Sequence, residues 1–71
     1  DPDKAPHERL SEREFQIMCM LARGKSVLEI ARDLFLSDKT VSTHRTRILK
    51  KMGMKKNADL MLYAIRNSLI E

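Results

Sequence analysis

The sequence predicts an all-α fold built from four helices. Apolar residues recur every three or four positions in four successive segments, which is the period of an amphipathic helix. Each of the first three segments is preceded by a serine, a residue type that caps helix starts. The two glycines, Gly24 and Gly53, stand where the first and third segments end, as expected of helix stops. A chain of 71 residues has room for one small domain of this kind.

A complete start signal predicts the first helix over residues 12–23. Ser11 can accept the backbone N–H of Glu14, whose carboxylate can reach back to the Ser11 N–H, forming a capping box. Leu10 and Phe15 stand at the two positions of a hydrophobic staple. Residues 1–9 contain two prolines and no apolar period, so we expect a linker or an appended tail there. The folded domain is therefore expected over residues 10–71.

A second helix over residues 27–34 and a third over residues 38–52 are predicted close together. Ser26 and Glu29 repeat the capping box, and Ser37 is a good N-cap for the third helix. Only the three residues FLS connect the two helices. A short helix, a brief turn and a longer capped helix form the outline of a helix-turn-helix. The fold prediction thereby narrows to a four-helix helix-turn-helix domain.

The third helix has two chemically different sides. Val41, Ile48 and Met52 stack on one side with Leu49 at its edge, and we expect them to be buried. The opposite side has no apolar residue and no acid. It presents Lys39, Thr43, Thr46, Arg47 and Lys50, with Ser42 on its flank. Because a structural surface helix usually interleaves acids with lysines to gain ion pairs, this side favours an anionic partner.

The fourth helix is predicted over residues 58–67, with Asn57 as its N-cap. We expect its inward stripe to be Ala58, Met61, Leu62, Ile65 and Leu69. The other side carries Leu60, Ala64 and Asn67, with Tyr63 beside them. Scattered apolar surface residues would need no explanation, but a second apolar side rimmed by polar groups favours a self-association face.

Positive charge is concentrated on the third helix and the loop after it. Residues 38–56 hold seven lysines and arginines against one aspartate, a net charge of +6, whereas the whole chain carries +4. This distribution is the electrostatic footprint of a nucleic-acid binder, although a basic solvated face alone could produce it.

Other classes of function lack the residues that they need. The chain shows no nucleophile–base pair, no paired carboxylates and no phosphate-binding glycine loop, so neither an enzyme nor a catalytic residue is predicted. His7, His44 and Cys19 do not have the spacing of zinc ligands, so no metal or other cofactor is expected. No apolar run is long enough to span a bilayer. The single cysteine is interpreted as a small core residue rather than a redox sensor, and it indicates a reducing, cytoplasmic location.

Five segments together carry a family resemblance: LSERE (10–14), ARG (22–24), EIARDLFLS (29–37), KTVSTH (39–44) and ILKKMGM (48–54). They resemble the C-terminal DNA-binding domain of the LuxR/FixJ/NarL family of bacterial transcription regulators, and its response-regulator branch in particular. The resemblance implies a third helix that enters the major groove of double-stranded DNA and a homodimer through the last helix. It also implies an N-terminal receiver domain, and we consider RNA polymerase as a further partner.

The same resemblance assigns DNA contacts along the third helix. Groove-facing positions fall on Ser42, Thr43 and Thr46, and phosphate-contacting positions fall on Lys39, Thr40, His44, Arg47 and Lys50. Three features depart from the family: Ser42 and Thr46 replace frequent lysines, Arg45 replaces a frequent apolar residue, and Lys56 replaces the serine that starts the last helix.

The leading hypothesis is sequence-specific binding of double-stranded DNA by a dimer that regulates transcription. The alternative is a protein-interaction module that docks on a receiver domain or on RNA polymerase, which the two-sided fourth helix could support. A helix lying on a membrane is disfavoured, because the third helix leaves no bulky apolar face free for lipid.

Overall fold

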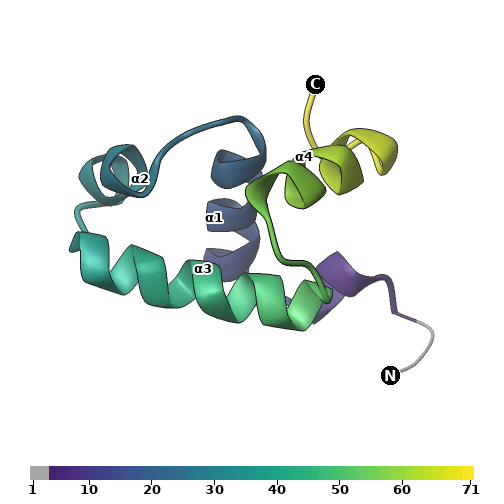
Figure 1. Cartoon of the computed structure of the whole chain (residues 1–71), viewed down its shortest axis with the longest axis horizontal. Helices are drawn as coiled ribbons and strands as arrows, with labels where there is room; N and C mark the ends of the chain where they lie inside the picture. Colours follow the sequence, from purple (N-terminus) through teal and green to yellow (C-terminus); the bar gives the residue numbers. More distant parts are fainter. Residues whose placement is uncertain (1–3) are drawn as a thin grey trace.

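The computed structural model describes residues 4–71, which form four α-helices and a short 3₁₀ helix, with no strand in this range (Figure 1). In chain order these are η1 (Pro6–Arg9), α1 (Glu12–Ala22), α2 (Val27–Leu34), α3 (Asp38–Met52) and α4 (Asn57–Arg66). α1 stands at the centre, α3 runs below it, and α2 and α4 lie on either side (Figure 1). The prediction of an all-α, four-helix domain is confirmed.

The start of α1 has the predicted capping chemistry. Ser11 Oγ accepts the Glu14 backbone N–H at 3.2 Å, and Glu14 Oε1 accepts the Ser11 N–H at 2.9 Å. This reciprocal pair satisfies two backbone donors that the first helical turn leaves free. Leu10 and Phe15 are both partly buried against the core, where the hydrophobic staple would place them.

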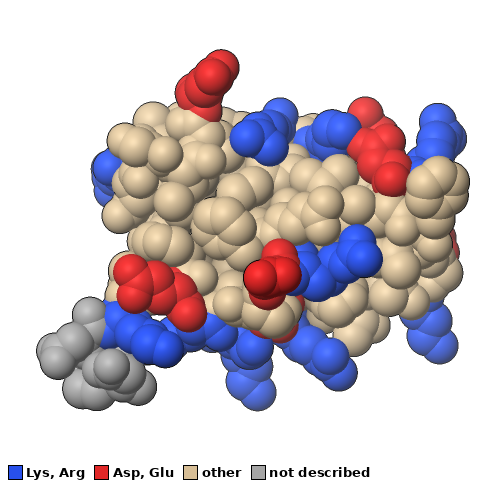
Figure 2. Space-filling model, turned by 180° about the vertical axis from the view of Figure 1, so that it is seen from behind, with Lys and Arg blue, Asp and Glu red and all other residues tan. Residues whose placement is uncertain are grey.

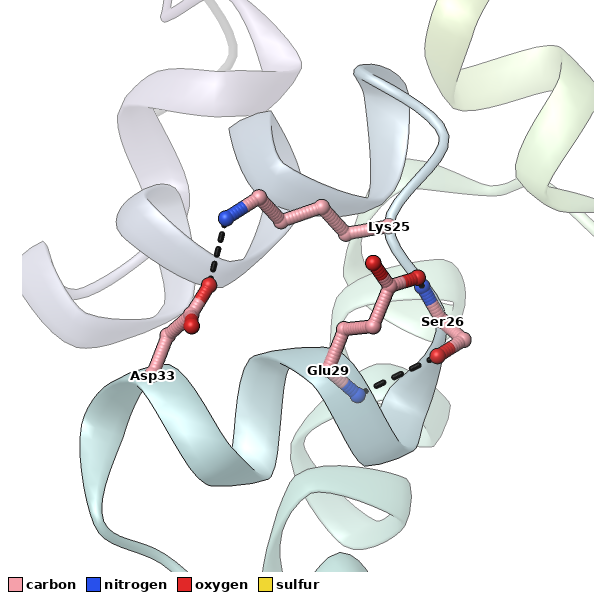
Figure 3. Close-up of polar contacts among 4 residues, drawn as sticks. All are labelled: Lys25, Ser26, Glu29 and Asp33. Carbon is pink, nitrogen blue, oxygen red and sulfur yellow. Dashed lines mark hydrogen bonds and ion pairs between the residues drawn. The ribbon is translucent and has the colours of Figure 1, made fainter.

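The start of α2 repeats this arrangement and adds an ion pair. Ser26 and Glu29 exchange side-chain to backbone hydrogen bonds of 3.0 and 3.1 Å. The Lys25 ammonium, just before α2, extends along the helix and pairs with the Asp33 carboxylate in its last turn (Figure 3). α2 spans Val27–Leu34, the range that the sequence predicts.

One side of each α-helix forms the hydrophobic core. Ile17 and Met18 of α1 are fully buried, as is Ile30 of α2. The predicted inward stripe of α3 is also buried, which confirms it: Val41, Ile48, Leu49 and Met52. The side of α3 opposite this stripe is therefore the side that faces solvent.

Within α4 the two apolar sides are the reverse of those predicted from the sequence, whereas Leu69, which follows the helix, packs against the core as expected. Leu60 and Ala64, expected on the free side, are 0% exposed and belong to the core. Met61, Leu62 and Ile65, expected to be inward, are 39%, 52% and 52% exposed. Both stripes are apolar, so periodicity alone could not decide between them, and the packing of α4 against α1 does. Leu60 and Ala64 are thereby removed from any surface that a partner could reach.

The segment before α1 also differs from the prediction. Residues 6–9 of the expected linker form η1, which packs on α3, while residues 1–3 of that linker lie outside the described range. The His7 backbone N–H donates to the Tyr63 hydroxyl at 3.4 Å, and the His7 Nδ1 lies 2.6 Å from the same oxygen. The His7 ring also lies against Phe15, at 6.0 Å between ring centroids. The folded unit therefore starts before residue 10, and it uses Tyr63 internally.

The start of α4 lies one residue earlier than predicted. Lys56, not Asn57, occupies the N-cap position, and the Asp59 carboxylate accepts the Lys56 backbone N–H at 3.3 Å. The Asn57 side chain instead accepts a hydrogen bond of 2.8 Å from Arg45 Nε. This contact gives Arg45 a structural role, because it ties α3 to the beginning of α4.

The turn between α2 and α3 contains a strained residue. Phe35 adopts the left-handed conformation, with φ 58° and ψ 41°, and its side chain is 95% exposed. A side chain with a Cβ atom costs roughly 1–2 kcal/mol in this conformation, and here no burial offsets the cost.

We therefore expect Phe35→Gly to stabilise the domain. Glycine adopts positive φ freely, and after the loss of its own chain entropy a gain of about 0.5–1 kcal/mol remains. The melting temperature, followed by circular dichroism, should rise by several degrees. Phe35→Ala is the matched control, since it removes the ring but keeps the Cβ atom, and it should change little. A glycine variant no more stable than the alanine variant would contradict this account.

Candidate nucleic-acid interface

The solvent side of α3 brings the predicted DNA-contacting residues together on one helix. All but one of them are exposed, and His44 is half-buried. The exposed members are Lys39, Thr40, Ser42, Thr43, Thr46, Arg47 and Lys50. Because the buried stripe of α3 fixes its rotation against the core, these side chains are held outward without a contribution from flexible loops.

The cations of this side are free of carboxylate partners. The ion pairs between residues 4 and 71 are Lys25–Asp33 and Lys51–Glu14, so none involves Lys39, Arg47 or Lys50. In the view from behind, lysine and arginine side chains project from the lower edge, along which α3 runs in Figure 1 (Figure 2). Three unpaired cations on one helix leave a positive field that a polyanion can neutralise.

The hydroxyl groups of this side are oriented by the helix itself. Thr43 Oγ1 donates to the Lys39 carbonyl at 3.0 Å, and Thr46 Oγ1 donates to the Ser42 carbonyl at 3.1 Å. Both hydroxyl hydrogens are therefore donated within the helix. Each threonine still presents the lone pairs of its oxygen and its methyl group to a partner outside the helix. Such a group can accept a hydrogen bond from an adenine or cytosine amino group, or contact a thymine methyl group.

At the N-terminus of α3 the cap leaves one hydroxyl hydrogen available. Ser37 Oγ accepts the Thr40 backbone N–H at 3.0 Å and donates to Thr40 Oγ1 at 2.8 Å. Because Thr40 Oγ1 is the acceptor in that bond, its own hydrogen remains free to donate to an anion. The positive end of the α3 dipole lies at the same place and favours a phosphate there.

His44 has an unusual environment for an interface residue. Its Nδ1 atom is buried and has no hydrogen-bond partner among the described residues. A ring proton on Nε2 rather than on Nδ1 avoids placing an unsatisfied N–H donor in that buried position. This tautomer keeps the Nε2–H as the donor that an external acceptor could use.

Lys51, in the last turn of α3, makes a specific inward contact. Its Nζ donates to Glu14 Oε1 at 2.8 Å, and the Glu14 side chain is only 7% exposed. The Lys51 ammonium and the Ser11 N–H together hold the pKa of Glu14 below its usual value, against the opposing effect of burial. Sequence reasoning missed this pair, because 37 residues separate its members.

Comparison with known proteins agrees with this geometry. The model of the bacterial regulatory proteins of the luxR family matches residues 8–64. The chain belongs to this family. It is 45% identical over 65 residues to the transcriptional regulatory protein LiaR of Bacillus subtilis (strain 168), a match that covers 92% of this chain and 31% of that protein. It is also 42% identical over 66 residues to the oxygen regulatory protein NreC of Staphylococcus aureus (strain JH9), covering 93% and 30%.

The resemblance seen in the sequence is thus confirmed, including the response-regulator branch to which both relatives belong. The domain is a helix-turn-helix DNA-binding domain of transcription regulation, and the luxR family is not a class of enzymes. The chain spans less than a third of the length of these curated relatives. Within residues 4–71, no group of three or more potential metal ligands lies together, and no helix is both long and apolar enough to cross a membrane.

Proposed function

We propose that this luxR-family domain binds double-stranded DNA sequence-specifically by inserting α3 into the major groove. The observation that carries the proposal is the exposed side of α3, on which cations and hydroxyl groups stand together without a carboxylate partner. A helix of this kind fits the width of the major groove of B-form DNA. The core behind it supplies a rigid support, which a direct contact to base edges needs.

In this proposal one set of side chains contacts bases and a second set contacts phosphates. Ser42, Thr43 and Thr46 face the base edges, where short hydroxyl side chains favour contacts to amino groups and thymine methyl groups. Lys39, Arg47 and Lys50 meet phosphates, supported by the Thr40 hydroxyl and by His44 Nε2–H. The first set selects the sequence, and the second fixes the position of the helix and supplies most of the affinity.

We further propose that the domain acts as a homodimer through α4. The proposed interface consists of the exposed apolar residues Met61, Leu62 and Ile65. It differs from the interface predicted from the sequence, which was Leu60, Tyr63, Ala64 and Asn67. A contiguous apolar stripe on a terminal helix is typical of a contact site. Two copies joined in this way would present two α3 helices to two half-sites.

In the whole protein, we propose that this domain is the output part of a two-component response regulator in the cytoplasm. The relatives are more than three times as long as the region matched, which leaves room for a receiver domain in such a protein. A receiver domain and RNA polymerase are then the expected protein partners.

The salt dependence of DNA binding tests the proposal. Three cations in each of two copies neutralise six phosphates, so log K should fall with log salt concentration at a slope of about −5. Binding is measured by fluorescence anisotropy on a duplex selected from a random library. Lys39→Ala or Arg47→Ala should weaken binding roughly tenfold and make the slope shallower by about 2, because each copy loses one contact.

Arg23→Ala serves as the control for that experiment. Arg23 is also exposed, but it lies directly after α1, at the end of that helix opposite α3 (Figure 1). Its removal should leave the affinity and the slope almost unchanged. Equal losses in the Arg23 and Arg47 variants would mean that the net charge, and not the α3 side, governs binding, which contradicts the proposed interface.

A further inference from the structure

A groove on the α4 side of the domain is not used by the proposed DNA contacts. Residues of α4 and of the loop that joins α3 to α4 line this groove, and its volume is about 600 Å³. Its walls carry both cationic and apolar side chains. The residues on which the argument rests are Met54, Lys55, Lys56, Leu62, Tyr63 and Arg66.

The polar part of the groove has an excess of positive charge. Lys55, Lys56 and Arg66 form no ion pair with any residue between 4 and 71. Asp59, the one acid that lines the groove, accepts the Lys56 backbone N–H, and against the three cations it leaves the lining with a net charge of +2. An excess of cations over carboxylates in the lining of one groove favours a ligand that supplies carboxylates.

The apolar part of the groove is formed in advance. Leu62 is 52% exposed, and Met54 and Tyr63 are partly buried against the core. The Tyr63 hydroxyl is held by His7, which fixes the ring at the wall of the groove. A wall that is already ordered loses little conformational entropy when a ligand binds to it.

We propose that this groove binds an acidic protein segment that carries a bulky apolar side chain. The apolar side chain packs against Met54 and the Tyr63 ring, and the flanking carboxylates pair with Lys55, Lys56 and Arg66. The combination of apolar anchor and charged rim is the usual composition of a peptide-binding site. This site is separate from the α3 side, so its existence does not depend on how the domain contacts DNA.

Charge and shape disfavour two other occupants. In the proposed α4 dimer a second copy contacts Leu62 at the border of the groove. It would bring the same cations to the rest of the groove, and like charges across an interface are repulsive. A DNA backbone could satisfy the cations, but its phosphates and sugars carry no bulky apolar group to fill the space beside Leu62. A protein segment supplies both kinds of group.

The test compares two pairs of substitutions that change the net charge equally. Lys55→Gln with Arg66→Gln removes cations from the groove, and Lys39→Gln with Lys50→Gln removes them from the α3 side. The probe is a fluorescein-labelled synthetic peptide of about 14 residues, rich in glutamate and with one phenylalanine and two leucines. Its binding to the chain is followed by anisotropy and by ¹H–¹⁵N chemical shifts.

The peptide should bind the unaltered chain with a Kd of about 10–100 μM, a range typical of short peptide contacts. The groove pair should weaken peptide binding at least tenfold and leave DNA binding nearly intact, whereas the α3 pair should do the opposite. A peptide with serine in place of its apolar residues should bind markedly less well. The changes in chemical shift on peptide binding should centre on Met54 and Tyr63.

Several outcomes would overturn the inference. If the peptide does not bind below millimolar concentration, acidic peptides are excluded as ligands of the groove. If the peptide binds both variant pairs equally, its binding reflects general charge attraction and not this groove. Loss of DNA binding in the groove pair, as large as in the α3 pair, assigns the cations to DNA. A change of oligomeric state in the groove pair, seen by sedimentation without peptide binding, assigns the groove to a second copy.

Discussion

Leu60→Asp is expected to unfold the domain, whereas Leu62→Asp should leave it folded. Leu60 is 0% exposed in the core, and Leu62 is 52% exposed two residues further along the same helix. Removing a buried leucine alone costs about 2–5 kcal/mol, and burying a carboxylate adds several more. A domain of this size has a free energy of unfolding of roughly 4–10 kcal/mol, so the cost of Leu60→Asp is enough to unfold it.

Circular dichroism and thermal melting of the two variants measure this difference. The Leu60 variant should lack a cooperative transition, and the Leu62 variant should melt within a few degrees of the unaltered chain. The reverse result would show that α4 is rotated by half a turn from the orientation described above. It would also restore the assignment of faces that the sequence alone suggested.

The Leu62 variant also tests the proposed dimer. A charged group in the middle of the Met61–Ile65 stripe should abolish self-association, because an aspartate from each copy would meet at a two-fold interface. Sedimentation velocity on a duplex with two half-sites should then show one copy bound at concentrations where the unaltered chain binds as two. Unchanged binding of two copies by the folded Leu62 variant would exclude α4 as the dimer contact.

Glu14→Ala is expected to be the second most damaging of the changes considered. One carboxylate accepts both the Ser11 N–H and the Lys51 ammonium, and it thereby joins the start of α1 to the end of α3. Loss of the capping bond and of a charge-assisted bond should cost about 2–3 kcal/mol, since Lys51 is partly exposed and partly screened. The melting temperature should fall by roughly 10–20 °C.

Glu29→Ala is the matched control for Glu14→Ala. Glu29 closes the same kind of capping box on α2, but it is exposed and makes no ion pair in the described residues. Its removal should lower the melting temperature by clearly less. Equal effects at the two positions would mean that the Lys51 contact adds nothing to stability.

The pH dependence of unfolding checks the same contact. The pKa of Glu14 is lowered in the folded state, mainly by the Lys51 bond and then by the Ser11 N–H. The folded state therefore binds this proton less readily than the unfolded state does. The stabilisation is fully present above the pKa of the unfolded chain and is lost as the pH falls through the lower folded-state pKa. Glu14→Gln should show a shallower loss of stability over that acidic range.

Local chemistry made the first three helices predictable. Capping serines, reciprocal glutamates and Gly53 act through neighbours within a few residues, so their effects are visible in the sequence and agree with the structure. The solvent side of α3 was predictable for the same reason, because a helix whose apolar residues lie on one side has only one way to face a core. Most of the candidate DNA-contacting residues lie on that side, and the family resemblance assigned their contacts.

The orientation of α4 was not predictable in this way. Its apolar residues occupy two sides, and helical periodicity is compatible with the burial of either side. The contact of Leu60 and Ala64 with the rest of the core decides the matter, and it depends on how α1 and α4 meet. The exposed stripe at Met61, Leu62 and Ile65 follows from that packing alone.

The sequence by itself thus determined the four helices, the two sides of α3 and the family of the domain. Only the tertiary structure decided which side of α4 is free, that Lys51 turns inward to Glu14, and that His7 belongs to the folded unit through Tyr63. The physical reason is sequence distance. Capping and helical period act between near neighbours, whereas these contacts join residues 37 and 56 positions apart, which no local pattern records.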